Sequence, residues 1–170
     1  MSPGTSEKPT GNHFPSLTAA QGAALIRTGE LRPSDWMKGC LDRSQRVEKI
    51  LRAWAYLDPD QALDSASKLN QVNWQDWQPT PHLAGVPIAV KDVFNTSDMP
   101  TQMGSQLWSG FRAGNDSRSV AHAKYAGSVV MGKSATAEFA VHSASDTINP
   151  HDPRRICGTS SAGSAVVVAS

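Results

Sequence analysis

Lys91 and the serines of a loop at residues 158–164 are the side chains of this sequence that could carry out chemistry together. Lys91 directly follows an apolar run, and the loop presents Ser160 and Ser161 among small residues. Removal from water disfavours the charged form of a lysine, and a neutral lysine beside a serine hydroxyl can act as a general base. In this order, the two features suggest a serine–lysine hydrolase. The structural alternative is that Lys91 only pairs with Asp92 at a strand end.

The elements that must position these residues are predicted to be two parallel strands joined by a helix. Val86–Val90 is a short, continuous apolar run, which is typical of a strand buried on both faces. Residues 117–126 favour a helix closed by Gly127, and residues 128–131 favour a second buried strand. A strand–helix–strand unit has a right-handed crossover and a parallel pair, and ligands bind at the carboxyl ends of such strands. Lys91 is predicted to lie at that edge.

The N-terminal half of the chain is predicted to contain three helices. Thr18 and Gln21 form a capping box for the first helix, which should end near Gly29. A second helix should begin after Pro33-Ser34, and Asp58 with the following proline should open a third. The expected apolar face of the second helix consists of Met37, Leu41, Val47, Ile50, Leu51 and Trp54.

The serine-rich loop is expected to lie between two further helices. A short helix should cover Ala135–Ala140, and Val166–Val168 should form the first turns of a helix that is apolar on all sides and buried. Residues 1–15 are polar and are predicted to be a disordered tail. The fold class that follows is α/β, with a single domain from residue 16 to residue 170.

Composition argues against several classes of function. The 170 residues carry a formal net charge of +1 without basic clusters, so neither nucleic acid nor a membrane surface is an expected partner. No apolar stretch has the length of a membrane span or of a signal-peptide core. The distant Cys40 and Cys157 are expected to be reduced thiols in a cytoplasmic protein, and the five histidines lack metal-ligand spacing.

Three short motifs suggest other chemistry. Residues 127–134 match the P-loop pattern G-x-x-x-x-G-K-[ST], but their apolar β-branched centre favours a strand, and a helix rather than a strand precedes them. Residues 65–68 match S-x-x-K on a helix whose polar face is expected to be solvated. Residues 158–162 resemble a nucleophile elbow but lack a preceding strand. A nucleotide-binding module at residues 127–134 is therefore the less favoured function.

Four segments in order resemble the amidase signature family. They are Gly85–Asp92, Gly127–Ala140, Asn149–Pro153 and Gly158–Ala165, and residues 17–58 are similar to the N-terminal helices of that family. The resemblance implies a mixed β-sheet flanked by helices on both sides. It also implies that residues 127–134 form a strand and a turn instead of a phosphate-binding loop.

The resemblance further implies a Ser–Ser–Lys triad. Lys91 matches the family lysine, and Ser160 matches the bridging serine, which follows a cis peptide bond and relays a proton. Ser161 and Gly163 help to hold the loop, in which Thr159 and Ala162 replace the usual glycines. The attacking serine of the family belongs to a later Gly-Gly-Ser segment, which would lie beyond Ser170.

The implied activity is cleavage of a carboxamide C–N bond through an acyl-serine, with a small-molecule amide as substrate and with neither metal nor cofactor. Residues 16–170 would then be the incomplete N-terminal portion of an amidase domain, ending after the bridging-serine loop and inactive alone. An A subunit of a glutamyl-tRNA amidotransferase, with partner subunits, is an alternative within the family, and a homodimer is another form of assembly to consider. A remnant without catalytic function is a further alternative.

Overall fold

The computed structural model describes residues 17–79 and 81–170, so the predicted tail at residues 1–15 lies outside the described part. A three-stranded mixed sheet forms the centre, in the order β1-β3-β2. The strands are β1 (Trp54–Tyr56), β2 (Pro87–Lys91) and β3 (Val129–Ser134). β3 pairs antiparallel with β1 and parallel with β2. The predicted parallel pair and the α/β class are therefore confirmed.

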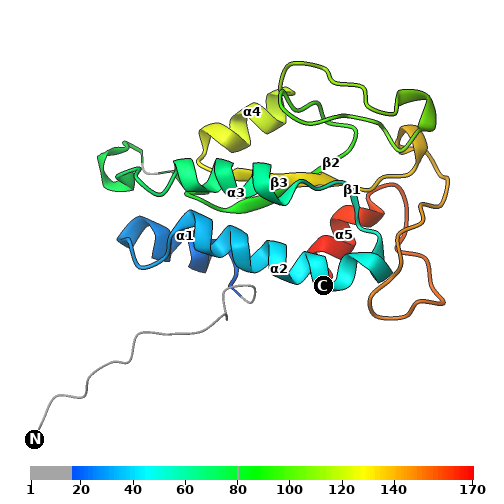
Figure 1. Ribbon diagram of the computed structural model, residues 1–170, viewed down its shortest axis with the longest axis horizontal. Helices are drawn as coiled ribbons and strands as arrows, with labels where there is room; N and C mark the ends of the chain where they lie inside the picture. The colour runs from blue at the N-terminus through cyan, green and yellow to red at the C-terminus, as the bar shows by residue number, and fades with distance from the viewer. Residues whose placement is uncertain (1–16, 80) are drawn as a thin grey trace, which may run out of the picture.

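Helices cover both faces of this sheet, with α4 on one side and α1, α2 and α5 on the other (Figure 1). None of the helices described is both long and apolar enough to cross a membrane. The helices are α1 (Ala19–Thr28), α2 (Pro33–Leu51), α3 (Pro59–Lys68), α4 (Arg118–Tyr125) and α5 (Ala162–Ala169), with short 3-10 turns at Trp74–Asp76, Gln106–Trp108 and Glu138–Ala140.

The helix boundaries follow the capping residues. Thr18 accepts a hydrogen bond from the Gln21 amide while the Gln21 side chain accepts one from the Thr18 amide, which is the predicted capping box. Gly29 ends α1 in the left-handed conformation with φ of 78°. Asp58 caps α3 through the Gln61 amide at 3.0 Å. Local side-chain chemistry thus defines the predicted ends of these helices.

β3 supplies the core, because all of its residues are buried and its side chains contact both faces of the sheet, with a shift in its register to β2 between Ile88 and Ala89. Val129 and Met131 pack with Met37 and other residues of α2 and α3. On the opposite face, Val130 packs with Val120 of α4. The predicted buried strand at residues 128–131 is confirmed in position, but it begins at Val129 and continues to Ser134.

Two predictions in the N-terminal half are wrong. α2 ends at Leu51 because Arg52 adopts a left-handed conformation with φ of 51°, so Trp54 belongs to β1 and not to the apolar face of α2. Ile50 also lies off that face, with 68 % of its surface exposed. The helical spacing of apolar residues in the sequence continues past Arg52, although the backbone leaves the helix there.

Three predictions about the later elements need correction. Only Val90 of β2 is buried, because β2 is an edge strand whose other residues are half-buried. The predicted helix Ala135–Ala140 is a single 3-10 turn, since Phe139 and Ala140 have φ values of 48° and 58°. α5 is not buried all round, because Val166 is buried but Val168 is 87 % exposed.

Candidate active site

The structure brings Lys91 and Ser160 together at the carboxyl end of β2. The Lys91 Nζ donates a hydrogen bond to the Ser160 Oγ over 2.6 Å, and both residues are half-buried. Their positions are 69 residues apart in the chain. The alternative in which Lys91 merely pairs with Asp92 is wrong, because Asp92 is engaged by Lys133 instead. A lysine amine and a serine hydroxyl at this distance can exchange a proton.

The backbone around Ser160 is held by the segment that follows β3. The Ser160 carbonyl accepts hydrogen bonds from the Ala137 amide and the Thr136 Oγ1, each at 3.0 Å. The peptide bond between Thr159 and Ser160 is cis, as the family resemblance implies. Sequence reasoning missed the part that Thr136 plays, because it assigned this segment to a helix.

The first turn of α5 lies very close to the sheet. The Gly163 amide donates to the Ala135 carbonyl at 3.0 Å, and a Cβ atom on Gly163 would lie 2.3 Å from the Ala135 nitrogen and 2.4 Å from the Ala53 carbonyl oxygen. One residue further on, the hydroxyls of Ser164 and Ser134 share a hydrogen bond of 2.7 Å. Only glycine allows this approach, so Gly163 fixes where the serine loop meets the strands.

A second lysine, Lys133, has a different environment on the neighbouring strand. It is fully buried and donates to the Thr101 Oγ1 at 2.7 Å and to the Pro100 carbonyl at 2.8 Å, with the Asp92 carboxylate at 3.1 Å. Burial raises the pKa of Asp92, while the adjacent Lys133 ammonium opposes the rise. Burial likewise lowers the pKa of Lys133, and Asp92 opposes that shift.

These contacts overturn the P-loop interpretation of residues 127–134. Val129–Ser134 is an extended strand paired on both sides, so its amides do not curl around a phosphate. Lys133 cannot reach a nucleotide either, because its ammonium is buried among three protein partners.

A cavity of about 360 Å³ opens beside the Lys91–Ser160 contact. Its lining includes Lys91, Phe94, Ser161 and Ser164. Ser161 is exposed and adds a hydroxyl next to Ser160. The arrangement places a lysine amine and several serine hydroxyls at the edge of one cavity. Within residues 17–79 and 81–170, no group of three or more His, Cys, Asp or Glu residues is placed to hold a metal ion.

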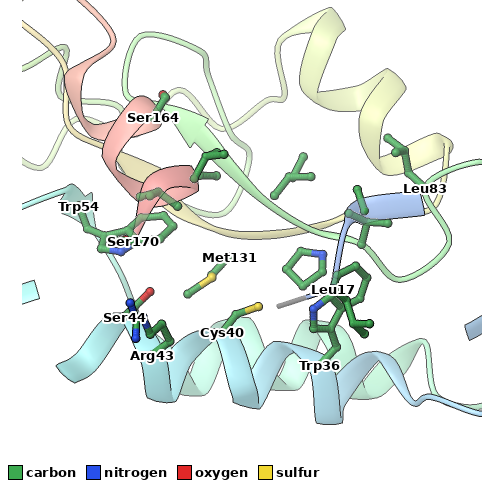
Figure 2. A pocket seen from close by; sticks show the side chains of 17 residues that line it. Leu17, Trp36, Cys40, Arg43, Ser44, Trp54, Leu83, Met131, Ser164 and Ser170 are labelled. Carbon is green, nitrogen blue, oxygen red and sulfur yellow. The ribbon is translucent and has the colours of Figure 1, made fainter. Parts of the chain in front are cut away.

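A larger cavity, of about 480 Å³, lies between α2, the sheet and α5. Figure 2 shows Cys40 rising from α2 towards Met131, with Trp36 and Trp54 at either end of the cavity. Burial raises the pKa of the Cys40 thiol to about 11, so the thiol stays protonated at neutral pH and is a poor nucleophile. Neither Lys91 nor Ser160 lines this larger cavity.

A family model described as amidase matches residues 35–170 of the chain. Two similar proteins are the A subunits of glutamyl-tRNA(Gln) amidotransferases. That of Chloroflexus aurantiacus is 37 % identical over 163 residues, or 92 % of this chain and 33 % of the relative. That of Salinispora arenicola is 38 % identical over 160 residues, or 91 % and 32 %. The chain spans about a third of the length of the curated relatives it matches.

Solved structures of amidases have a similar fold. The native peptide amidase from Stenotrophomonas maltophilia superimposes with a TM-score of 0.79 at 29 % identity, covering 94 % of this chain and 35 % of that one. An amidase family protein from Bacillus anthracis gives a TM-score of 0.80 at 27 % identity, covering 92 % and 34 %. In both cases the match covers most of this chain.

Proposed function

This chain belongs to the amidase family, and on that premise we propose that it supplies Lys91 and Ser160 to the cleavage of a carboxamide bond through an acyl-serine. The observation that carries the proposal is the hydrogen bond of 2.6 Å between the Lys91 Nζ and the Ser160 Oγ. Lys91 is the base and Ser160 is the bridging serine of a Ser–Ser–Lys triad. Ser161 and Gly163 support the loop. A small-molecule amide is the proposed substrate.

The proposed proton path runs from an attacking serine through Ser160 to Lys91. As the attacking oxygen bonds to the amide carbon, its proton passes to the Ser160 hydroxyl, and the Ser160 proton passes to the Lys91 amine. When the C–N bond breaks, the Ser160 hydroxyl gives one proton to the leaving nitrogen, and the Lys91 ammonium returns a proton to Ser160. Water then attacks the acyl-serine by the same relay. Every proton transfer uses a lysine or serine group, so the path requires neither a metal ion nor a cofactor.

The attacking serine of this path corresponds to a position beyond Ser170. A test of the proposal must therefore supply that part of the domain. We propose a chimera in which residues 17–170 replace the matching third of the Stenotrophomonas maltophilia peptide amidase. Hydrolysis of peptide amides by this chimera is then compared with hydrolysis by its Lys91→Ala and Ser160→Ala variants.

Each of these variants is expected to lower kcat by about a hundredfold or more, the size of a lost general base. The matched control is Lys68→Ala, which removes a lysine whose side chain is 71 % exposed in a surface ion pair and which should leave kcat unchanged. If Lys91→Ala and Ser160→Ala both retain full activity, the proposal fails and the chain is better described as a remnant without a catalytic role.

A role as the A subunit of a glutamyl-tRNA amidotransferase is a second candidate. It is favoured by the identity of 37 % and 38 % to the A subunits from Chloroflexus aurantiacus and Salinispora arenicola. Such a role implies partner subunits. The test is to place residues 17–170 within the corresponding Chloroflexus aurantiacus protein and to measure amide transfer to glutamyl-tRNA(Gln) in the assembled enzyme. Activity that appears only with the other subunits would favour this candidate. Hydrolysis of simple amides by the single chimeric chain would favour the free-standing amidase.

A further inference from the structure

We propose that Asp92 and Lys133 are positioning residues, whose buried ion pair holds Lys91 and Ser160 at hydrogen-bonding distance. The proposal rests on the function proposed above, since it concerns the same proton relay. Neither residue touches Ser160 or the cavity beside Lys91. Their influence must therefore pass through the backbone and through the loop that covers the pair.

The pair is held rigidly on the side of the sheet opposite α5. Both side chains have no exposed surface, and the Lys133 Nζ has three oxygen partners within 3.1 Å. The Asp92 carboxylate also accepts the Gln102 amide, at 3.1 Å and 3.2 Å to its two oxygens. A buried ion pair with this many hydrogen bonds is held in a single arrangement and resists displacement.

The pair reaches Lys91 through the ends of two strands. Asp92 follows Lys91 directly, and its amide donates to the Ser134 carbonyl at 3.1 Å. In the parallel register, Val90 lies opposite Lys133 and Lys91 lies opposite Ser134. Successive side chains of a strand point to opposite faces. Holding Asp92 and Lys133 on one face therefore directs Lys91 to the other face, where Ser160 lies.

The pair reaches Ser160 through the loop at residues 100–105. The Asp92 carbonyl accepts the Met103 amide at 2.9 Å, and the Met103 carbonyl accepts the Phe139 amide at 2.8 Å. The Ser105 hydroxyl donates to the Glu138 carboxylate at 2.7 Å. These bonds anchor the turn at residues 136–139, whose Thr136 and Ala137 bind the Ser160 carbonyl.

The test measures how fast the Lys91 amine of this chain is acetylated by acetic anhydride, with peptide mass spectrometry to separate the lysines. Lys68, with a side chain 71 % exposed, is the internal reference. Ser160→Ala removes the partner of Lys91 and should raise the Lys91 rate about tenfold, near the upper end of the factor for the loss of one ordinary hydrogen bond. Asp92→Leu combined with Lys133→Met replaces the pair by apolar side chains of similar size, which the fold can accept.

This double variant should raise the Lys91 rate as Ser160→Ala does, and adding Ser160→Ala to it should raise the rate no further. Asp92→Asn with Lys133→Met keeps an acceptor for the Gln102 amide, so its Lys91 rate should lie between those of the wild type and the apolar variant. Met37→Ala, a fully buried position on α2, is the control for instability alone and should leave the Lys91 rate unchanged.

The outcomes separate the two proposals. If Ser160→Ala raises the Lys91 rate while both paired variants leave it at the wild-type value, the positioning role is wrong and the relay stands. If Ser160→Ala changes nothing, the contact itself is absent, and the relay and the positioning role both fail. If circular dichroism shows that the apolar variant is unfolded, Asp92→Asn with Lys133→Met decides: a raised rate supports the positioning role, and an unchanged rate overturns it.

Discussion

At the scale of single residues, two lysines at neighbouring strand ends differ because they lie on opposite faces of the sheet. Lys91 is half-buried and meets a serine hydroxyl. Lys133 is fully buried and meets a carboxylate, a hydroxyl and a carbonyl. Each follows an apolar run in the sequence. The difference in chemistry comes from register and from the loop that covers Lys133, which local sequence does not specify.

Asp92→Asn is expected to destabilise the chain by about 3–5 kcal/mol, because it leaves the buried Lys133 ammonium without a counter-charge. Asp92→Leu with Lys133→Met should cost much less, since no charge is then left unpaired. Urea unfolding of the wild type and the two variants measures both effects. A double variant less stable than Asp92→Asn would contradict the assignment of the pair.

Gly163→Ala is expected to cost about 1–3 kcal/mol, the usual penalty for overpacking. The added Cβ would lie 2.3 Å from the Ala135 nitrogen, so α5 must move away from the sheet and take the serine loop with it. Ala165→Ser, on the exposed side of the same helix, should change the free energy of unfolding by less than about 0.5 kcal/mol. Equal effects of the two substitutions would show that α5 does not pack as described.

At the scale of elements, the sequence predicts best where a local signal and the tertiary structure agree. This agreement made two features predictable: the capping box at Thr18, and the crossover from β2 through α4 to β3. The turn at residues 135–140 was not, because Phe139 and Ala140 adopt positive φ values where the Phe139 amide bonds to the distant Met103 carbonyl. The site pair itself was placed through the family resemblance, whereas the buried pair beneath it required the structure.

The stability that Asp116 contributes, by joining the loop before α4 to Lys124 on α4, should depend on pH. Partial burial favours a higher pKa for Asp116, but hydrogen bonds from Lys124 and the Ser97 amide outweigh it and hold the pKa of Asp116 below its ordinary 3.8. A depressed pKa means that folding favours the carboxylate, so this stabilisation is present above pH 3.8 and is lost as the pH falls through the lower folded-state value. The stability difference between the wild type and Asp116→Asn should therefore shrink on acidification. A difference independent of pH would refute this.

Residues 127–134 should not bind nucleotide, since they form a strand whose lysine is buried. Calorimetric titration of the chain with magnesium-ATP is expected to show no saturable binding. The outcome that would restore the P-loop interpretation is micromolar affinity that disappears in Lys133→Ala.

At the scale of the whole molecule, the chain contains the Lys91–Ser160 contact to which we assign the proposed relay. β2 lies at the edge of the sheet, and the cavity beside Lys91 lies along it. The chain corresponds to about a third of its curated relatives. We therefore propose that the attacking serine comes from outside residues 17–170 and that Ser160 passes protons without forming the acyl intermediate.

The most direct measurement of this claim is to find which serine reacts covalently. The chimera with the Stenotrophomonas maltophilia peptide amidase is treated with a fluorophosphonate, whose phosphorus bonds to an activated serine oxygen as fluoride leaves. Peptide mass spectrometry then locates the label. We predict a label on a serine outside residues 17–170, formed more slowly in Ser160→Ala and Lys91→Ala, and no label on the 170-residue chain alone. A label on Ser160 itself would contradict the account, because Ser160 would then be the nucleophile and not the relay.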